Sequence, residues 1–185
     1  MAALKIAKLG NPILRQVAQP VDLNELTRPG KNEIQAFMDD MIETMRAAHG
    51  AGLAAPQVSR SIQIVVLECL NNPRYPGRDE FPLTVLVNPR ITRYGEEEVL
   101  GWESCLSLID FRGLAPRSKQ VTVDAHDRFG EKVHIEAEGF PAVALQHEID
   151  HLNGIIFLER MADLTQLSYQ EEFETYWLKQ DVAAV

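Results

Sequence analysis

The segment PAVALQHEIDHLNG, residues 141–154, predicts a helix around which the rest of the chain is expected to fold. Pro141 suits the first turn of a helix, and Gly154 suits the position after its end. His147 and His151 stand four positions apart, so a helix places both imidazoles on one face. Two such imidazoles can bind one metal ion, and the segment therefore carries the HExxH pattern of a metal site.

The glutamate of this pattern is placed for proton transfer. Glu148 lies about 100° round the helix axis from His147, given about 3.6 residues per turn, and so beside a bound metal rather than on it. From there a carboxylate can take a proton from a water molecule activated by the metal and hand it to a leaving group. A chance match on a solvated helix is the alternative, but the apolar neighbours Val143, Ala144 and Ile149 favour metal binding.

A catalytic metal site of this kind needs a third protein ligand and an open position. Phe157 stands where proteases with the longer HExxHxxGxxH pattern carry their third histidine, so that class is excluded. Proteases with a glutamate ligand on a later helix form a second hypothesis. Its candidate ligands, which are better explained as a solvated acidic helix face, are Glu171, Glu172 and Glu174. Another candidate is Cys105, because a thiolate is a strong ligand for iron or zinc, although a buried structural cysteine has the same pattern.

The segment GAGLAAPQ, residues 50–57, combines two glycines with other small residues. Glycines let a backbone pass close to another group. Gln57 ends the segment with an amide donor. The GxGxxG spacing and the lysine of phosphate-binding loops are missing, so the segment predicts no nucleotide site.

The rest of the chain predicts an α+β fold, without the regular alternation of a doubly wound sheet. Residues 31–48 are predicted to form an amphipathic helix, and Gly50 is expected to follow it as a left-handed cap residue. A surface loop with three prolines is predicted at 69–82. Short strands are predicted at 62–68, 83–88, 120–125 and 131–137, the last two as a hairpin.

The C-terminal helix is expected to begin near Ser168, with Ser168 and Glu171 as a capping box. Residues 1–185 are therefore expected to form a single catalytic domain. In this domain, short antiparallel strands pack around the central HExxH helix, with an N-terminal and a C-terminal helix outside them.

The composition is that of an ordinary globular domain, with 45% hydrophobic and 24% charged residues among 185. A net charge of −9 argues against a nucleic-acid binder that neutralises phosphates. No apolar run approaches the ~20 residues of a membrane helix, and the N-terminal stretch does not resemble a secretory signal. We therefore expect a cytoplasmic protein without membrane contact, in which Cys69 and Cys105 are reduced.

Taken together, three segments resemble the sequence blocks of the peptide deformylase family. The family's GxGxAAxQ, EGCLS and QHExDHxxG blocks stand here, in that order, at 50–57, 103–107 and 146–154. The first and third match at every fixed position. In the second, Ser104 replaces the usual glycine.

The resemblance implies a metal-dependent amidase that hydrolyses the formyl group from the N-terminal methionine of newly made polypeptides and releases formate. It implies that Cys105, His147 and His151 bind one Fe²⁺ ion per chain, with Zn²⁺, Ni²⁺ or Co²⁺ as alternatives in purified protein. Glu148 matches the general acid/base of the family.

The resemblance also implies a site for the formyl oxygen and one for the peptide. The side chain of Gln57 and the backbone N–H of Leu106 match the two donors to the formyl oxygen, and two fixed donors beside a metal suit an oxyanion. Gly52 is expected beside the substrate, and Arg112 either anchors the peptide backbone or is only a surface charge. The pocket for the methionine side chain is expected one turn or more before His147, at Phe140, Val143 and Ala144.

The expected partners are N-formylmethionyl peptides and nascent chains, with no direct nucleic-acid binding. Some family members contact the ribosome through a basic C-terminal helix. The resemblance therefore implies a transient ribosome contact for this chain too, although its C-terminal tail is acidic. The charged residues of the tail are Glu171, Glu172, Glu174 and Asp181, against Lys179.

A degenerate family member that only binds N-termini or ribosomes is a third hypothesis, and Ser104 is the feature in its favour. Glycine tolerates a positive φ, whereas another residue adopts it at a cost of about 1–3 kcal/mol. Because Cys105 and Leu106 must be held accurately for ligation and oxyanion binding, we expect Ser104 to have an ordinary φ.

Overall fold

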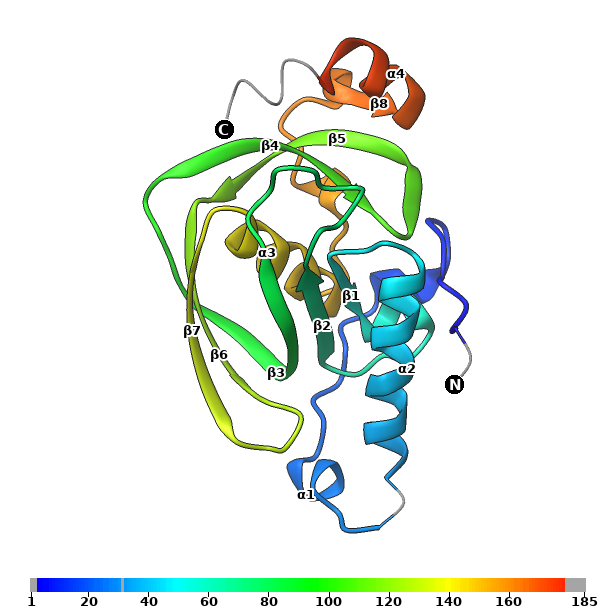
Figure 1. The fold of residues 1–185 in the computed structure, drawn as a ribbon, viewed down its shortest axis with the longest axis vertical. Coiled ribbons are helices and arrows are strands. Elements are labelled where there is room, and N and C mark those ends of the chain that lie inside the picture. The colour runs from blue at the N-terminus through cyan, green and yellow to red at the C-terminus, as the bar shows by residue number, and fades with distance from the viewer. Residues whose placement is uncertain (1–2, 31, 179–185) are drawn as a thin grey trace.

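The computed structural model describes residues 3–30 and 32–178 and confirms the α+β architecture (Figure 1). The α-helices are α1 (Leu23–Leu26), α2 (Glu33–Ala47), α3 (Phe140–Leu152) and α4 (Gln170–Tyr176). The strands are β1 (Gly52–Ala54), β2 (Ile64–Cys69), β3 (Phe81–Tyr94), β4 (Glu98–Cys105), β5 (Leu108–Ser118), β6 (Gln120–His126), β7 (Lys132–Glu138) and β8 (Leu167–Tyr169). Short 3-10 helices lie at Pro12–Arg15, Ala55–Val58, Phe157–Glu159 and Leu164–Gln166.

The larger sheet has five antiparallel strands in the order β1-β2-β3-β6-β7. Strand β2 is buried on both faces, and its alternate side chains point to opposite sides. Val65 and Leu67 belong to the core that includes α3, whereas Ile64 and Val66 belong to the core that includes α2. The sheet therefore lies between the two long helices, which explains why residues 64–67 of β2 are all apolar.

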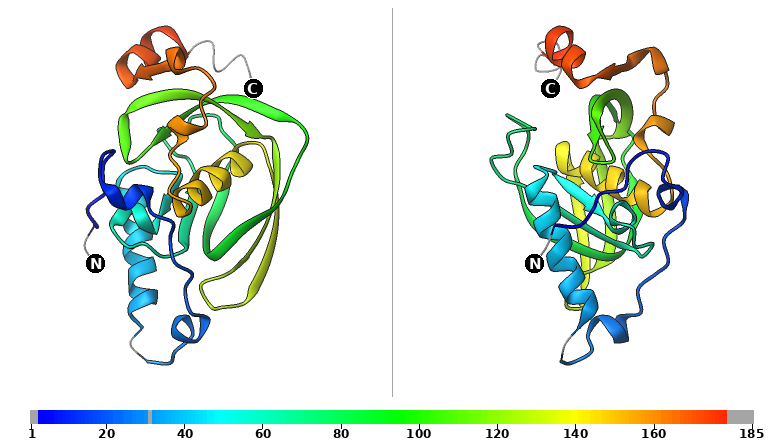
Figure 2. Two further views of the ribbon diagram at one scale, coloured as in Figure 1. Left: turned by 180° about the vertical axis from the view of Figure 1, so that it is seen from behind. Right: turned by 90° about the vertical axis from the view of Figure 1, so that its right-hand side faces the viewer.

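The smaller sheet is formed by the β4–β5 hairpin, with β8 paired to the other edge of β5. Figures 1 and 2 show this long ribbon crossing one end of the molecule, with β8 and α4 beyond it. Helix α3 contacts strands of both sheets, and all its residues from 144 to 152 are buried. The central position predicted for the HExxH helix is confirmed.

Helix α2 confirms the predicted amphipathic helix, but the prediction that Gly50 is its left-handed cap residue is wrong. The helix begins at Glu33, and the predicted first residue, Lys31, lies outside the described residues. The positive φ of 51° belongs to His49 and not to Gly50. A glycine is needed at position 50 for a different reason, because a Cβ there would lie only 2.8 Å from Cδ1 of Leu106.

The strands reach further than their apolar runs predict. Strand β3 spans 14 residues, whereas the sequence pattern predicts only 83–88. The β6–β7 hairpin is confirmed. The β4–β5 hairpin has no counterpart among the predicted strands. Its residues mix charged, glycine and apolar side chains, and a register shift between Glu103 and Cys105 interrupts the alternation on which a strand prediction depends.

The start of the C-terminal helix also differs from the prediction. Ser168 pairs with Arg112 in the β5–β8 ladder, and its hydroxyl donates to the carbonyl of Tyr169. Helix α4 begins only at Gln170. Pairing with β5 therefore keeps Ser168 extended and overrides the local capping signal that Ser168 and Glu171 give.

Cys69 and Cys105 are both free, as predicted, and both are buried. Among residues 3–30 and 32–178, no helix is long and apolar enough to cross a membrane.

Candidate metal centre

Helix α3 and strand β4 bring the three predicted metal ligands together. The ring centroids of His147 and His151 lie 5.0 Å apart, one turn from each other on α3. Cys105 ends β4, and its Sγ lies 3.2 Å from Nε2 of His151. One ligand atom from each of the three residues lies within 4.8 Å of the other two. The three side chains are therefore close enough to hold one ion.

The electrostatics of this group suit a cation. Burial opposes ionisation of the Cys105 thiol, yet His151 and His147 lower its pKa well below the usual value. Burial also opposes a charge on His147, yet Cys105 and Glu103 raise its pKa well above the usual value. A deprotonated thiol is the form that binds a metal, and the negative charge that raises the pKa of His147 also favours a metal cation.

Glu103 fixes the orientation of one histidine. Nδ1 of His147 donates to Oε2 of Glu103 at 2.6 Å, so Nε2 is the ring nitrogen that could bind a metal. Burial opposes ionisation of Glu103, but the hydrogen bond from His147 and the charge of Arg117 lower its pKa to about 2. A carboxylate behind a metal-binding histidine holds both the ring and its tautomer. Sequence reasoning missed this role, although Glu103 stands in the same block as Cys105.

A buried ion-pair network joins Glu103 to α3. Arg117 of β5 donates from Nε to Glu103 and from Nη1 to Asp150, each at 2.6 Å. Asp150 also accepts from Nε of Arg160 at 2.9 Å. Because Asp150 precedes His151 on α3, the network connects β4, β5 and α3 around the predicted metal ligands. Removing one member would leave a buried charge without its partner, which destabilises a fold strongly.

Glu148 lies in the same buried region, with its carboxylate directed at β1. Burial raises the pKa of Glu148 to about 7, although His147 and His151 act to lower it. A carboxyl group that titrates near neutral pH can both take and return a proton. Oε2 of Glu148 has no hydrogen-bond partner within the described chain. A Cβ on Gly52 would lie 2.6 Å from Cγ of Glu148, so only glycine lets β1 pass this carboxylate.

The two predicted donors to the formyl oxygen lie next to Cys105. Oε1 of Gln57 accepts from the N–H of Ala54 at 2.8 Å, and Nε2 of Gln57 donates to Sγ of Cys105 at 3.4 Å. Leu106 follows Cys105 in the β4–β5 turn. Because the ladder pairs Cys105 with Leu108, the N–H of Leu106 takes no part in it. The Gln57 donor therefore stands beside the thiolate, and Leu106 directly follows the cysteine in the chain.

The residues predicted to form the methionine pocket lie on the same face of α3 as His147. Phe140, Val143 and Ala144 precede His147 by seven, four and three positions, which places all four on one side of the helix. Val143 is half-buried and Ala144 is buried. The ring of Phe140 packs against Tyr75, with 5.1 Å between the centroids.

Arg112 is buried, with 6% of its surface exposed, so its interpretation as a surface charge is wrong. Its Nε donates to Oε1 of Gln170 at 2.7 Å, and its guanidinium lies 5.4 Å from the ring centroid of Phe173. Pairing of β8 with β5 therefore places α4 directly on the residue that is expected to anchor the peptide.

The glutamates of α4 take no part in the metal group. Helix α4 exposes Glu171, Glu172 and Glu174, as a solvated face predicts. In the described part of the chain, the group that could hold a metal consists of Cys105, His147 and His151. The hypothesis of a protease with a glutamate ligand on this helix is therefore wrong.

Ser104 has an ordinary φ, as predicted. It is not among the non-glycine residues of the described chain that have a positive φ. They are His49, Ser59, Asn71 and Asn88. Ser104 is part of the extended strand β4, so the backbone needs no glycine there. The hypothesis of a degenerate site thereby loses the backbone strain on which it depended.

The chain is similar to known proteins over most of its length. Residues 3–167 match the family model described as polypeptide deformylase. Peptide deformylase 1 of Bordetella pertussis is 43% identical over 166 residues, which cover 90% of this chain and 92% of the relative. Peptide deformylase 2 of Nostoc sp. is 38% identical over 172 residues, which cover 92% of this chain and 93% of the relative.

Solved structures show the same similarity. The class I type b peptide deformylase from Acinetobacter baumannii with Met-Ala-Ser bound superposes with a TM-score of 0.82 and 42% identity, over 86% of this chain and 99% of that chain. Peptide deformylase from Thermotoga maritima gives a TM-score of 0.76 and 32% identity, over 88% and 100%. The matched region includes the cysteine, both histidines and the glutamate of the site. The chain therefore belongs to the polypeptide deformylase family, the metal-dependent hydrolases that remove the N-formyl group from nascent polypeptides.

Proposed function

We propose that Cys105, His147 and His151 hold one Fe²⁺ ion per chain for the hydrolysis of N-formylmethionine. The observation that carries this proposal is the convergence of the three ligand atoms within 4.8 Å. One thiolate and two imidazoles suit Fe²⁺, Zn²⁺, Ni²⁺ and Co²⁺, and Fe²⁺ is the ion that the family resemblance implies. When bound, the ion polarises a carbonyl group and lowers the pKa of a water molecule.

The identity of the metal is tested by elemental analysis of protein purified without oxygen. We expect about one iron atom per chain, and less iron in a parallel preparation purified in air. Zinc, nickel or cobalt in place of iron in the oxygen-free protein would contradict the assignment of Fe²⁺.

Three other residues carry out the proton transfer and bind the oxyanion. Glu148 takes a proton from the attacking water and returns it to the amine of the leaving peptide. Nε2 of Gln57 and the backbone N–H of Leu106 donate to the formyl oxygen as negative charge develops on it. Each fixed donor of this kind contributes about 3 kcal/mol to catalysis.

The substrates are N-formylmethionyl peptides and nascent chains. Phe140, Val143 and Ala144 receive the methionine side chain, Gly52 lies beside the peptide, and Arg112 anchors the peptide backbone. The similar Acinetobacter structure has Met-Ala-Ser bound, which supports a ligand that begins with methionine.

The enzyme acts in the cytoplasm as one catalytic domain over residues 1–185, and its contact with the ribosome is transient. The three exposed glutamates of α4 make this helix a poor partner for phosphate-rich RNA, so we expect no direct nucleic-acid binding. Lys179 and Asp181 of the predicted acidic tail lie outside the described residues.

Gly52→Ala is expected to lower the rate of formate release about 10²-fold, with the metal content unchanged. The new Cβ would meet Cγ of Glu148 at 2.6 Å and displace the carboxylate, and a small misplacement of a reacting group costs about this much. The measurement is the kcat for formyl-Met-Ala-Ser.

Gly101→Ala is the matched control for Gly52→Ala. A Cβ at Gly101 in β4 meets nothing within 4 Å, so this variant should keep the full rate. A Gly52→Ala protein with the kcat of the unmodified chain would show that the carboxylate moves aside without loss.

Glu103→Gln is expected to weaken metal binding about 10- to 100-fold, because the charged partner of His147 is lost. The measurement is metal retention against a chelator of known affinity. Glu98→Gln changes the same charge at an exposed position of the same strand and should leave retention unchanged. Equal retention by the two variants would contradict the role of Glu103.

A further inference from the structure

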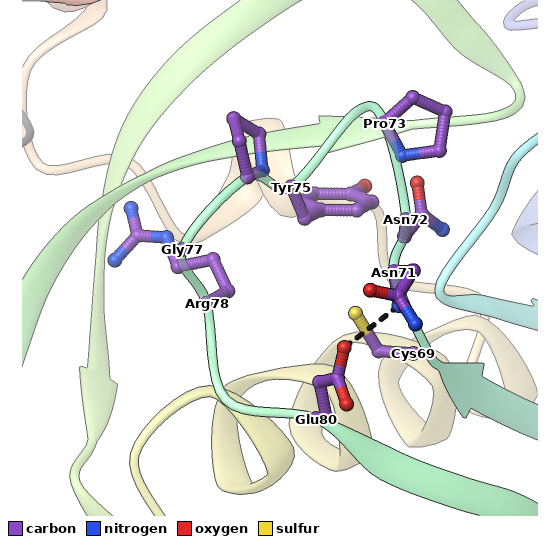
Figure 3. Close-up of a pocket in the computed structure, with 9 residues that line it drawn as sticks. Cys69, Asn71, Asn72, Pro73, Tyr75, Gly77, Arg78 and Glu80 are labelled. Atoms are coloured by element: carbon purple, nitrogen blue, oxygen red, sulfur yellow. Dashed lines mark hydrogen bonds between the residues drawn. The ribbon is translucent and has the colours of Figure 1, made fainter.

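The loop 70–80 joins β2 to β3 and lines an open pocket of about 300 Å³ (Figure 3). Figure 3 shows the loop curving around this space, with the carboxylate of Glu80 bonded to the N–H of Asn71 across its base. Because the loop borders an open pocket rather than a packed core, contacts at its edges must hold its shape.

One of these contacts ties the loop to the strand that carries the metal ligand. Nη2 of Arg74 donates to Oγ of Ser104 at 3.0 Å, and the hydroxyl of Tyr75 lies 3.3 Å from the same oxygen. Ser104 is buried, with 8% of its surface exposed, and it directly precedes Cys105. The glycine usual at this position in the family would offer no such hydroxyl. The serine therefore supplies an anchor that the backbone alone does not require.

A second contact ties the same loop to the start of α3. The ring of Tyr75 packs on Phe140, whose own ring lies 5.9 Å from that of Phe81. Oδ2 of Asp79 accepts from the backbone N–H of Phe140 at 3.4 Å. Tyr75 thus stands between Ser104 on one side and Phe140 on the other, so movement at one contact changes the other.

We propose that Ser104, through Arg74 and Tyr75, fixes the loop 70–80 as one wall of the pocket for the methionine side chain. Ser104 is then a specificity-determining residue, not a catalytic one. This inference rests on the proposed function, which places that pocket at Phe140 and the next turn of α3. It requires that loss of the anchor weakens binding of a long first side chain and leaves the hydrolytic step unchanged.

The test compares formyl-Met-Ala-Ser with formyl-Ala-Ala-Ser as substrates for Ser104→Ala and Tyr75→Phe. For the methionine peptide, Tyr75→Phe removes one hydrogen bond and should raise KM about fivefold, and Ser104→Ala removes both contacts to Oγ and should raise KM at least as much. In both variants kcat and metal content should stay within about twofold of the unmodified chain. For the alanine peptide, KM should change less than about twofold. Because the contact that Tyr75→Phe removes is also lost in Ser104→Ala, the double variant should be little worse than Ser104→Ala alone.

Tyr94→Phe is the control, because it removes a tyrosine hydroxyl at an exposed position of β3 and should change neither KM. Equal losses on both peptides, a lower kcat or a loss of metal would overturn the proposal, because they would show a general or metal-directed role for Ser104. Unchanged KM values in both variants would overturn it as well. The unmodified chain is assayed first. If it releases no formate, the result contradicts the proposed function and not the role of Ser104.

Discussion

Glu148→Ala is expected to lower formate release at least about 10²-fold while the metal content stays that of the unmodified chain. Glu148 is buried, and one of its oxygens has no partner within the described residues. The side chain is therefore placed to accept a proton rather than to support the fold. The measurement is kcat for formyl-Met-Ala-Ser together with elemental analysis of the same sample.

Two further variants make the interpretation of Glu148→Ala specific. Glu148→Gln keeps the shape of the side chain and removes its basicity, so it should lose as much activity as the alanine variant. Glu172→Ala removes a glutamate from the exposed face of α4 and should keep the full rate. Normal turnover by a metal-replete Glu148→Ala protein would exclude this residue from proton transfer.

Cys105→Ala is expected to remove most of the bound metal and, with it, the activity. The site then keeps two imidazoles but loses the thiolate, which is its one negatively charged ligand. Cys69→Ala is the matched control, because Cys69 is the other free, buried cysteine and does not belong to the metal group. Metal per folded chain should stay near one in this control. Equal metal contents in the two variants would contradict ligation by Cys105.

Local sequence periodicity was enough to predict the part of the site that lies on one helix. Glu148 and His151 follow His147 by one and four positions, and helix geometry alone sets the relative directions of the three side chains. Cys105 is different, because a lone cysteine in a segment with no clear period has several explanations. Its assignment depended on the order of three sequence blocks, and the fold then placed its sulfur 3.2 Å from Nε2 of His151.

The residues that support the site could not be predicted in this way. Glu103, Arg117 and Asp150 meet only because β4, β5 and α3 pack together, and no local pattern encodes that approach. The same holds for Ser168, whose capping signal is overridden by pairing with β5. In each case a contact between distant parts of the chain decides the outcome, and propensity is only a weak guide to such contacts.

The most direct test of this account measures formate and metal in one experiment on protein purified without oxygen. Incubation with formyl-Met-Ala-Ser should release formate in equal amount to free Met-Ala-Ser, at a rate proportional to bound metal across partly chelated samples. The acetylated peptide Ac-Met-Ala-Ser controls for general amidase activity and should remain intact. A fully metallated protein that releases no formate would contradict the assignment of Cys105, His147 and His151 as the centre of a deformylase.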